Sequence, residues 1–202
     1  MSSKVLDFVE QPDAYTCQSA AIARVLGTTD VMSIRHLLTE GGRDAGDPWN
    51  MGQYLGKYCQ EYRFSLTASL NDARKALEAG FQLITHGFFT GSGHVIGLSR
   101  VSADPKALSY RFNAEDPWYE FDFLSWSYTR NSGDDVSYSS YGIYAACVAS
   151  SSVSHAAEIY RRGELNSAMG NMWLHIIKKL KSSRSPSSWG RSRATCTLSV
   201  KT

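Results

Sequence analysis

The chain has 202 residues, of which 43% are hydrophobic and 20% charged, and its formal net charge is +2. This composition is ordinary for a globular protein of one domain with a sizeable core. No stretch approaches the roughly 20 apolar residues that a membrane-spanning helix needs, and the N-terminal residues lack the apolar segment of a signal peptide. We therefore expect synthesis in the cytoplasm, with delivery to the cell envelope or secretion by another route left open.

The charge and the cysteines are unevenly placed. Residues 1–160 contain 12 Lys/Arg and 18 Asp/Glu, a net charge of −6, whereas residues 161–202 contain 9 and 1, a net charge of +8. The four cysteines, at positions 17, 59, 147 and 196, form no Cys-x2-Cys pair and no zinc-type cluster with histidine. We therefore expect free thiols in a reducing compartment, and no metal or cofactor.

The first part of the chain is predicted to be helical. After a short extended run, an apolar stretch begins at Cys17 and has the pattern of a buried helix up to Leu26. Three further helices are expected, each after a polar N-cap residue: 31–40 after Asp30, 50–62 after Asn50, and 72–79 after Asn71.

The following part is predicted to be an antiparallel sheet. Four strands are expected, over residues 81–89, 94–101, 108–114 and 141–149, with a short helix or turn over 120–126. Helices followed by antiparallel strands indicate an α+β fold, in which the N-terminal helices pack on the sheet.

The character of the sequence changes after residue 150, so we divide the chain into a domain over residues 1–150 and a basic helical extension over 151–202. Helices are expected over 155–162 and 166–180, and residues 182–193 are of low complexity. The second helix would carry an apolar stripe: Met169, Trp173, Ile176, Ile177 and Leu180. Three interpretations stay open. The stripe packs on the body of the protein, or the helix binds an anionic surface, which is a membrane, a cell envelope or nucleic acid, or it docks a partner protein. No specific nucleic-acid partner is expected.

Cys17 is the leading candidate for a functional residue, because it opens the first helix. A thiol at a helix N-terminus feels the positive end of the helix dipole, which favours the nucleophilic thiolate. Gln11, six residues earlier, is placed to donate its side-chain amide to an oxyanion beside the sulfur. The alternative for Cys17 is a small buried hydrophobic residue. Cys59, on an apolar helix face, and Cys147, in an apolar strand, are expected to be inert core thiols.

His94 is the candidate base. It follows a Gly-Ser-Gly turn at the start of an apolar strand, where close approach to a cysteine is sterically easy. His86 is its main competitor, but a histidine in the middle of a strand is more often structural. The other histidines are His36 in the second helix, and His155 and His175 in the C-terminal extension.

Asp116 is the candidate to orient the imidazole. It ends the next predicted strand, directly before Pro117. Asn113 and Glu115 are neighbouring alternatives for the same role. A cysteine, then a histidine at a strand start, then an acid at the end of the next strand is the chain order of papain-type enzymes.

The combination of Gln-x5-Cys, a Gly-His strand and a following Asp-Pro resembles the C39-like cysteine peptidases, a branch of the papain-like superfamily. The resemblance covers roughly residues 5–150. It implies a papain-like fold and cofactor-free cysteine peptidase activity, with Cys17 as nucleophile, His94 as base, Asp116 as its orienting partner and Gln11 at the oxyanion. Where the family usually has Cys-Gly-Pro, this chain has Cys17-Gln18-Ser19.

These residues favour a papain-like thiol hydrolase that cleaves peptide or amide bonds. A specific variant is a cell-wall-directed peptidase of the phage-lysis type, an endolysin, whose basic C-terminal helix engages the envelope while the site acts on peptidoglycan. Two alternatives stay open. The Cys-Gln-Ser sequence is compatible with a catalytically silent binding or effector module, and the same triad also serves a glutamine deamidase or transamidase.

Overall fold

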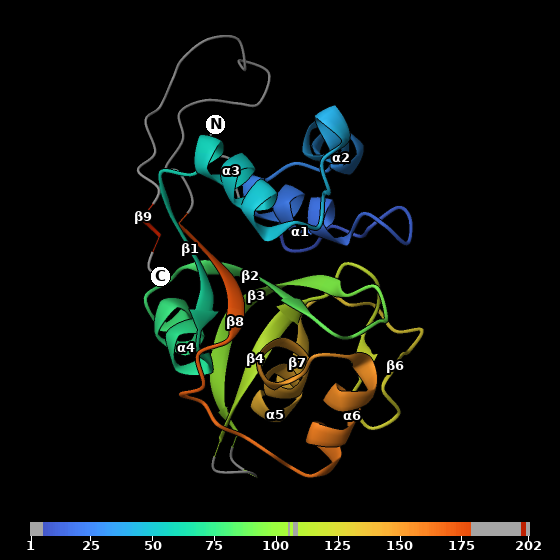
Figure 1. Cartoon of the computed structure of the whole chain (residues 1–202), viewed down its shortest axis with the longest axis vertical. Helices are drawn as coiled ribbons and strands as arrows, with labels where there is room; N and C mark the ends of the chain where they lie inside the picture. Colours follow the sequence, from blue (N-terminus) through green and yellow to red (C-terminus); the bar gives the residue numbers. More distant parts are fainter. Residues whose placement is uncertain (1–5, 105, 107–108, 179–198, 201–202) are drawn as a thin grey trace.

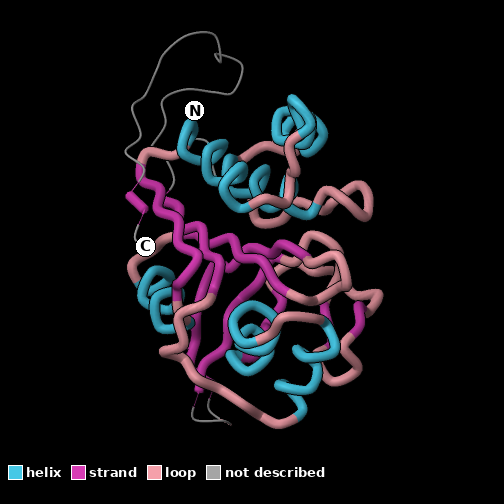
Figure 2. Tube along the Cα trace, in the orientation of Figure 1, coloured by secondary structure: helices cyan, strands magenta, loops and turns pink. Residues whose placement is uncertain are grey.

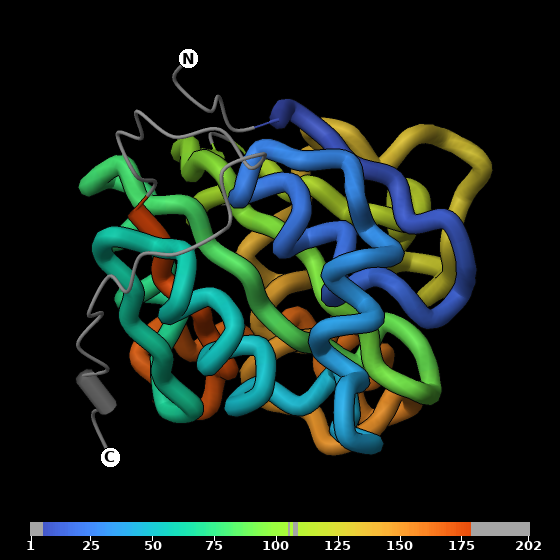
Figure 3. The backbone as a smooth tube through the Cα atoms, turned by 90° about the horizontal axis from the view of Figure 1, so that it is seen from above, coloured from blue at the N-terminus to red at the C-terminus, as the bar shows by residue number. Residues whose placement is uncertain are grey.

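The computed structural model describes residues 6–104, 106, 109–178 and 199–200, and it has an α+β fold built in three layers (Figure 1). One face of a central sheet is covered by α1 (Cys17–Leu26), α2 (Val31–Thr39) and α3 (Pro48–Tyr58), and the other by α4 (Leu70–Glu78), α5 (Ser140–Tyr144) and α6 (Val153–Arg161). Seen from above, α1–α3 lie across the strands (Figure 3). None of the helices in these residues has the length and apolar character needed to cross a membrane.

The sheet has the strand order β7-β4-β3-β2-β8-β1-β9 and is antiparallel except where β9 pairs in parallel with β1. Its strands are β1 (Glu61–Ala68), β2 (Gln82–Gly87), β3 (His94–Asp104), β4 (Ser109–Glu115), β7 (Val136–Ser139), β8 (Met172–Lys178) and β9 (Ser199–Val200). A separate ribbon is formed by β5 (Phe121–Asp122) and β6 (Ser127–Tyr128) (Figure 2). Two short helical turns complete the described elements, η1 (Glu40–Gly42) and the π-helical η2 (Ala145–Ala149).

The side chains of the strands point alternately to the two faces of the sheet, so the core consists of two clusters. In β3, Val95 packs against α1–α3, whereas Ile96 and Leu98 belong to the cluster on the other face. In β8, Ile177 and Leu174 are divided in the same way. Because successive side chains of a strand point to opposite faces, both layers hold the central strands in place. The start of β3, which carries His94, is therefore fixed from two sides.

The helices and the hairpin expected in residues 17–115 are present with small shifts. Asp30 caps α2 by accepting a hydrogen bond from Ser33 N at 3.1 Å. β2 and β3 pair across a turn closed by the backbone bond from Gly93 N to Thr90 O. The other two caps differ from expectation, since Asp47 caps α3 and Ser69 caps α4.

The predicted helix over residues 166–180 is wrong. Residues 172–178 form β8, which pairs with β1 on one side and β2 on the other. This segment therefore belongs to the main fold, and the division of the chain at residue 150 is wrong for it. Met172, Leu174 and His175 are completely buried. A short apolar run fits both a helical stripe and a strand buried on both faces, so periodicity did not decide between them.

The basic helix expected to engage an anionic surface is consequently not formed over residues 172–178. The remaining part of that prediction, including Leu180, the lysines at 179 and 181 and the low-complexity end, falls on residues 179–198, which lie outside the described residues.

The predicted closing strand over residues 141–149 is also wrong, because α5 and η2 occupy this segment. Ser139 starts the helical turn by accepting a hydrogen bond from Gly142 N at 3.1 Å. The strand at this edge is β7, which pairs with β4. A continuous apolar run does not distinguish a buried strand from a buried helix.

Two further segments differ from expectation. The predicted third helix ends at Tyr58, and β1 begins at Glu61. Residues 120–126, expected as a short helix or turn, contain β5 followed by a turn, in which Trp126 has a φ of 52°.

Candidate active site

Cys17 is the first residue of α1 and is half-buried. Thr16 occupies the N-cap, but its side chain makes no capping hydrogen bond. The first backbone N–H groups of the helix are thus not taken by the cap side chain, and the positive end of the helix dipole lies at the thiol. Complete burial of Ala20 and Ile22 holds the helix against the sheet.

His94 lies between Cys17 and Asp116. Its Nε2 is 2.8 Å from Asp116 Oδ1, and Cys17 is close enough to contribute to the raised pKa of the imidazole. Because Nε2 is taken by the carboxylate, Nδ1 is the ring nitrogen left for the sulfur. Gly93, directly before His94, has a φ of 79°, a conformation that glycine adopts without strain. The fold thus brings three side chains together that are 22 to 99 residues apart in the sequence.

Asp116 is fully buried and is held by several donors. Besides His94, the Trp118 backbone N–H donates to Oδ1 at 3.2 Å, and the hydroxyls of Tyr138 and Tyr128 donate to Oδ2 at 3.1 and 3.4 Å. Gly133 packs so closely that a Cβ on it would lie 2.0 Å from the carbonyl oxygen of Asp116. The carboxylate is therefore fixed in position, and its charge is compensated by hydrogen bonds.

The carboxylate decides the charge of the imidazole. Burial by itself would lower the pKa of His94, but the charge and hydrogen bond of Asp116, together with Cys17, outweigh burial and raise this pKa to about 10. The ring is therefore protonated at neutral pH. A cationic imidazole beside a cysteine favours the thiolate, so the arrangement suits nucleophilic thiol chemistry.

Gln11 lies next to this group. Its backbone N–H donates to Pro117 O at 2.8 Å, which ties residue 11 to the loop that carries Asp116. Its side-chain Nε2 donates to Asp13 O at 2.6 Å, and its Oε1 is buried with no hydrogen-bond partner among the described residues.

Gln18, the residue directly after the cysteine, contacts the thiol. Its Oε1 accepts a hydrogen bond from Cys17 Sγ at 3.2 Å, and its Nε2 donates to Tyr15 O at 3.0 Å. The departure from Cys-Gly-Pro was visible in the sequence, but the contact was not, because it depends on how the side chain folds back over the helix start.

Cys17 and His94 line a cavity of about 670 Å³. One wall comes from the helical layer and includes Gln18 and Arg35, and the other comes from the end of β2, from η2 and from β8. Ligand pockets commonly have volumes of about 300–1,000 Å³. The thiol thus faces a space large enough to admit part of a substrate.

The competing histidines are placed differently. His86 and His175 face each other, with 3.2 Å between their Nε2 atoms, and His175 Nδ1 is 2.7 Å from the Tyr62 hydroxyl. Burial lowers the pKa of His86 to about 4 and that of His175 well below its ordinary value. Both rings are therefore neutral. His36 and His155 are exposed on helices.

The alternatives for the acid and for the thiol also have other environments. Asn113 donates to Asp135 Oδ1 at 2.9 Å, and Glu115 pairs with Arg24. Cys59 is buried in the core beneath α1–α3. Cys147 is buried as well, and burial raises its pKa to about 12. The predicted strand around Cys147 is helical, but the thiol is the inert one expected from the sequence.

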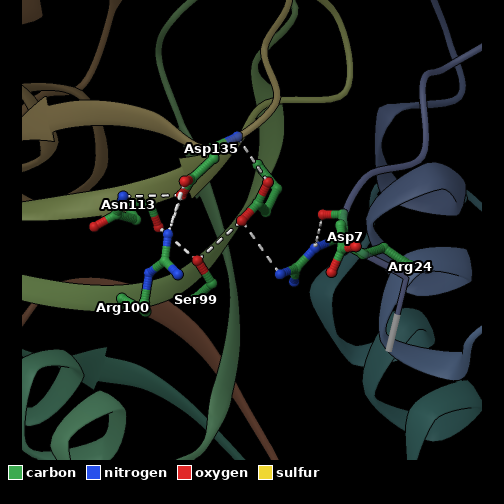
Figure 4. Close-up of polar contacts among 7 residues, drawn as sticks. Asp7, Arg24, Ser99, Arg100, Asn113 and Asp135 are labelled. Atoms are coloured by element: carbon green, nitrogen blue, oxygen red, sulfur yellow. Dashed lines mark hydrogen bonds and ion pairs between the residues drawn. The ribbon is translucent and has the colours of Figure 1, made fainter. Parts of the chain in front are cut away.

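A buried ion pair that sequence reasoning missed connects α1 to the strand before Asp116. Arg24 Nη2 lies 3.3 Å from Glu115 Oε1, and both side chains are nearly inaccessible. Ser99 Oγ and the Asp135 backbone N–H also donate to Glu115, at 2.9 and 3.0 Å. Figure 4 shows Arg24 reaching from the helix toward the strands that carry Ser99, Arg100 and Asn113. The only sequence signal was an arginine inside an apolar helical stretch, two turns after Cys17.

Comparison with known proteins finds no matching family model, no matching curated protein and no matching solved structure. The described residues contain no group of three or more His, Cys, Asp or Glu side chains that could hold a metal ion. Function is therefore inferred from the geometry of the site itself.

Proposed function

We propose that this protein is a papain-like thiol hydrolase that cleaves a peptide or amide bond. The observation that carries the proposal is the position of His94, which lines the same cavity as Cys17 and is hydrogen-bonded to buried Asp116 at 2.8 Å. In papain-type catalysis the nucleophile, the base and its orienting acid have this arrangement. The C39-like resemblance of residues 5–150 gives the same roles to the same residues.

In the first half of the reaction, Cys17 Sγ attacks the substrate carbonyl carbon. The protonated His94 then gives its proton to the leaving amine, and an acyl-cysteine remains. In the second half, a water molecule gives a proton to His94 and attacks the acyl carbon, which releases the acid and the free thiolate. Asp116 keeps the imidazole oriented and stabilises its positive charge throughout.

The oxyanion formed in both halves needs hydrogen-bond donors. The backbone N–H of Cys17, at the start of α1, is one donor that we propose. Gln11 is the second, through the N–H of its side-chain amide that Asp13 O does not use. If Gln11 donates, Gln11→Ala should lower kcat by about 10²–10³. An unchanged kcat would leave the oxyanion to backbone donors alone.

The proposal is tested by incubation with a peptide library and, separately, with purified peptidoglycan, each with and without a primary amine. New free carboxyl termini indicate hydrolysis, and amine adducts indicate transamidation. Hydrolysis of peptidoglycan would support the cell-wall-directed variant. Cys17→Ala is the matched control. The proposal fails if Cys17 reacts with iodoacetamide at neutral pH no faster than the buried Cys59 and Cys147, because a binding or effector module needs no activated thiol.

A further inference from the structure

The wall of the cavity opposite α1 has no assigned role in the chemistry above. It is built by His86 and Phe88 around the end of β2, by Val148 of η2, and by Trp173 of β8. Asn171 Nδ2 donates to Val148 O at 3.0 Å, which joins the segment before β8 to η2. This wall is continuous with Cys17 and His94, because all of these residues line the same cavity.

The wall is uncharged. Of the lining residues, only Arg35 and Asp44 carry a full charge at neutral pH besides the catalytic group itself, and both belong to the helical side. They are of opposite sign, and each is held to the helical side by a backbone hydrogen bond: Arg35 donates to Tyr15 O at 2.9 Å, and Asp44 accepts from Gly46 N at 2.8 Å.

The two titratable groups on the wall are both held neutral by burial. Burial lowers the pKa of His86 to about 4 and raises the pKa of Cys147 to about 12. His86 is also fixed in orientation, by His175 at its Nε2 and by the ring of Trp173, whose centroid is 5.7 Å away at an interplanar angle of 63°. The wall therefore has a fixed shape and no charge across the neutral range.

The size of the cavity and the absence of charge on its wall limit which substrate side chains it can bind. A charged side chain would lose its hydration without meeting an opposite charge on the wall, which is strongly unfavourable. A small side chain would leave the aromatic and aliphatic surface of Phe88, Val148 and Trp173 uncovered, and each uncovered apolar group forfeits transfer free energy.

We propose that this cavity is a specificity pocket for a large, uncharged side chain, aromatic or branched aliphatic, next to the bond that Cys17 attacks. The assignment of the substrate class rests on the proposed function. The pocket itself is a property of the wall, and it is tested separately from the reaction.

The test uses acyl-aminoacyl chloromethyl ketones that carry the side chains of Phe, Leu, Ala, Glu and Lys. Their rates of alkylation at Cys17 are divided by their rates with a free thiol. The Phe and Leu reagents should react at least about tenfold faster than the Glu and Lys reagents, since pocket discrimination commonly amounts to 10–200-fold. Equal normalised rates would overturn the proposal.

A charge placed on the wall should redirect this preference. Trp173 is 43% exposed, so Trp173→Lys is compatible with folding, and it should raise the Glu-to-Lys rate ratio at least about tenfold. Trp49→Lys is the matched control, because Trp49 is 42% exposed and does not line the cavity. Ser151→Lys, at an exposed position on the η2 side of the cavity, is the second variant if Trp173→Lys fails to fold. An unchanged ratio in a folded variant counts against the pocket.

The binding preference of the pocket can also be measured in a variant whose thiol is absent. In Cys17→Ala, NMR titration follows the binding of N-acetyl amino-acid amides with the same five side chains. The order Phe and Leu above Glu and Lys supports the pocket even if the iodoacetamide experiment rejects the hydrolase. Equal binding overturns the pocket even if the hydrolase is established.

Discussion

Two histidines face the same cavity from neighbouring strands, and they differ in charge at neutral pH. The pKa of His94, at the start of β3, is raised to about 10, whereas the pKa of His86, near the end of β2, is lowered to about 4. His94 is buried and His86 is partly buried, and burial by itself lowers the pKa of both. The difference comes from the partner, which is the carboxylate of Asp116 for His94 and the neutral ring of His175 for His86.

This difference shows how one fold can form two unlike walls from the same residue types: a wall with Cys17 and His94, which we propose to be the reactive wall, and an inert wall with Cys147 and His86. Each wall also has a cysteine: Cys17 beside the imidazolium, and Cys147 in an environment where burial raises its pKa to about 12. A buried charge is tolerated only where an opposite charge and hydrogen bonds compensate it. The proposed chemistry therefore belongs to the wall with Cys17 and His94, where buried Asp116 compensates the charge of the imidazole.

The largest expected effect separates the two thiols. Cys17→Ala should abolish hydrolysis, because it removes the attacking atom and little volume. Cys147→Ala should keep the reaction, because a neutral buried thiol takes no part in it. Turnover of a peptide identified in the library, with circular dichroism to confirm folding, measures both. An inactive Cys147→Ala beside an active Cys17→Ala would reverse the assignment of the two walls.

The next effect separates the two histidines. His94→Ala should lower kcat/KM by about 10³-fold or more, as loss of a triad base does in other hydrolases. His86→Ala should change stability and KM, with a smaller effect on kcat, because His86 belongs to the wall and not to the reacting group. Steady-state kinetics on the same peptide gives the split. If His86→Ala shows the larger loss of kcat, the base has been misassigned.

Asp116→Asn tests the cause of the difference between the histidines. The amide keeps the shape of the carboxylate but not its charge, so the pKa of His94 should fall and kcat should drop by about 10²–10⁴-fold. NMR titration of the His94 ring follows the pKa. Asp134→Asn, an exposed carboxylate two positions from buried Val136, is the control. A His94 pKa unchanged by Asp116→Asn would mean that another group holds the charge.

The sequence predicted the elements around Cys17, His94 and Asp116 better than those of the opposite wall. Each of these three residues lies at one end of an element, beside a signal that can be read locally: a helix start, a Gly-Ser-Gly turn and an Asp-Pro pair. The inert wall depends on β8 and η2, whose apolar runs fit helix and strand equally well. His175 was placed in an extension because nothing local indicates that residues 172–178 lie between β1 and β2.

The Arg24–Glu115 pair was missed for a related reason. Its members are 91 positions apart, and each alone is an ordinary charged residue. Only the packing of α1 on the sheet shows that both are buried. Gln11, by contrast, was noticed from its spacing to Cys17, but the bond of its amide to Asp13 could not be read from spacing.

The Arg24–Glu115 pair supports the reactive wall by fixing α1 against the strand before Asp116. Arg24→Met should destabilise the fold by about 3–5 kcal/mol, because it leaves Glu115 charged and buried without its partner. The double variant Arg24→Met/Glu115→Gln should recover part of this loss. Arg100→Met, which breaks the exposed pair with Asp135, should cost only about 0.2–1 kcal/mol. Urea unfolding measures the stability of all three variants. If Arg24→Met and Arg100→Met lose equal free energy of unfolding, the buried pair does not stabilise the fold more than the exposed pair.

The smallest expected effect is on the pH dependence of stability, to which His94 and His86 contribute with opposite sign. It is measured in Cys17→Ala, so that the thiol does not titrate. The raised pKa of His94 means that the folded state holds a proton that the unfolded state releases near pH 6.5. This contribution is complete below pH 6.5 and is lost as pH rises toward the folded pKa. The lowered pKa of His86 acts in reverse: its contribution is complete above pH 6.5 and is lost as pH falls toward 4.

His94 should therefore add a slope of at most about 1.4 kcal/mol per pH unit to the stability curve, falling above pH 6.5. His86 and His175, whose pKa values are both lowered, should each add a slope of at most about the same size, rising toward pH 6.5. Urea unfolding of Cys17→Ala, alone and combined with Asp116→Asn or His86→Phe, tests the two limbs. Asp116→Asn should flatten the alkaline limb and leave the acid limb unchanged, because it removes the charge that holds the proton on His94. His86→Phe should reduce the acid limb, because phenylalanine keeps an aromatic ring on the wall but does not titrate, and the part that remains belongs to His175. If both substitutions alter the same limb, the two histidines are coupled through the cavity and the walls are not electrostatically separate.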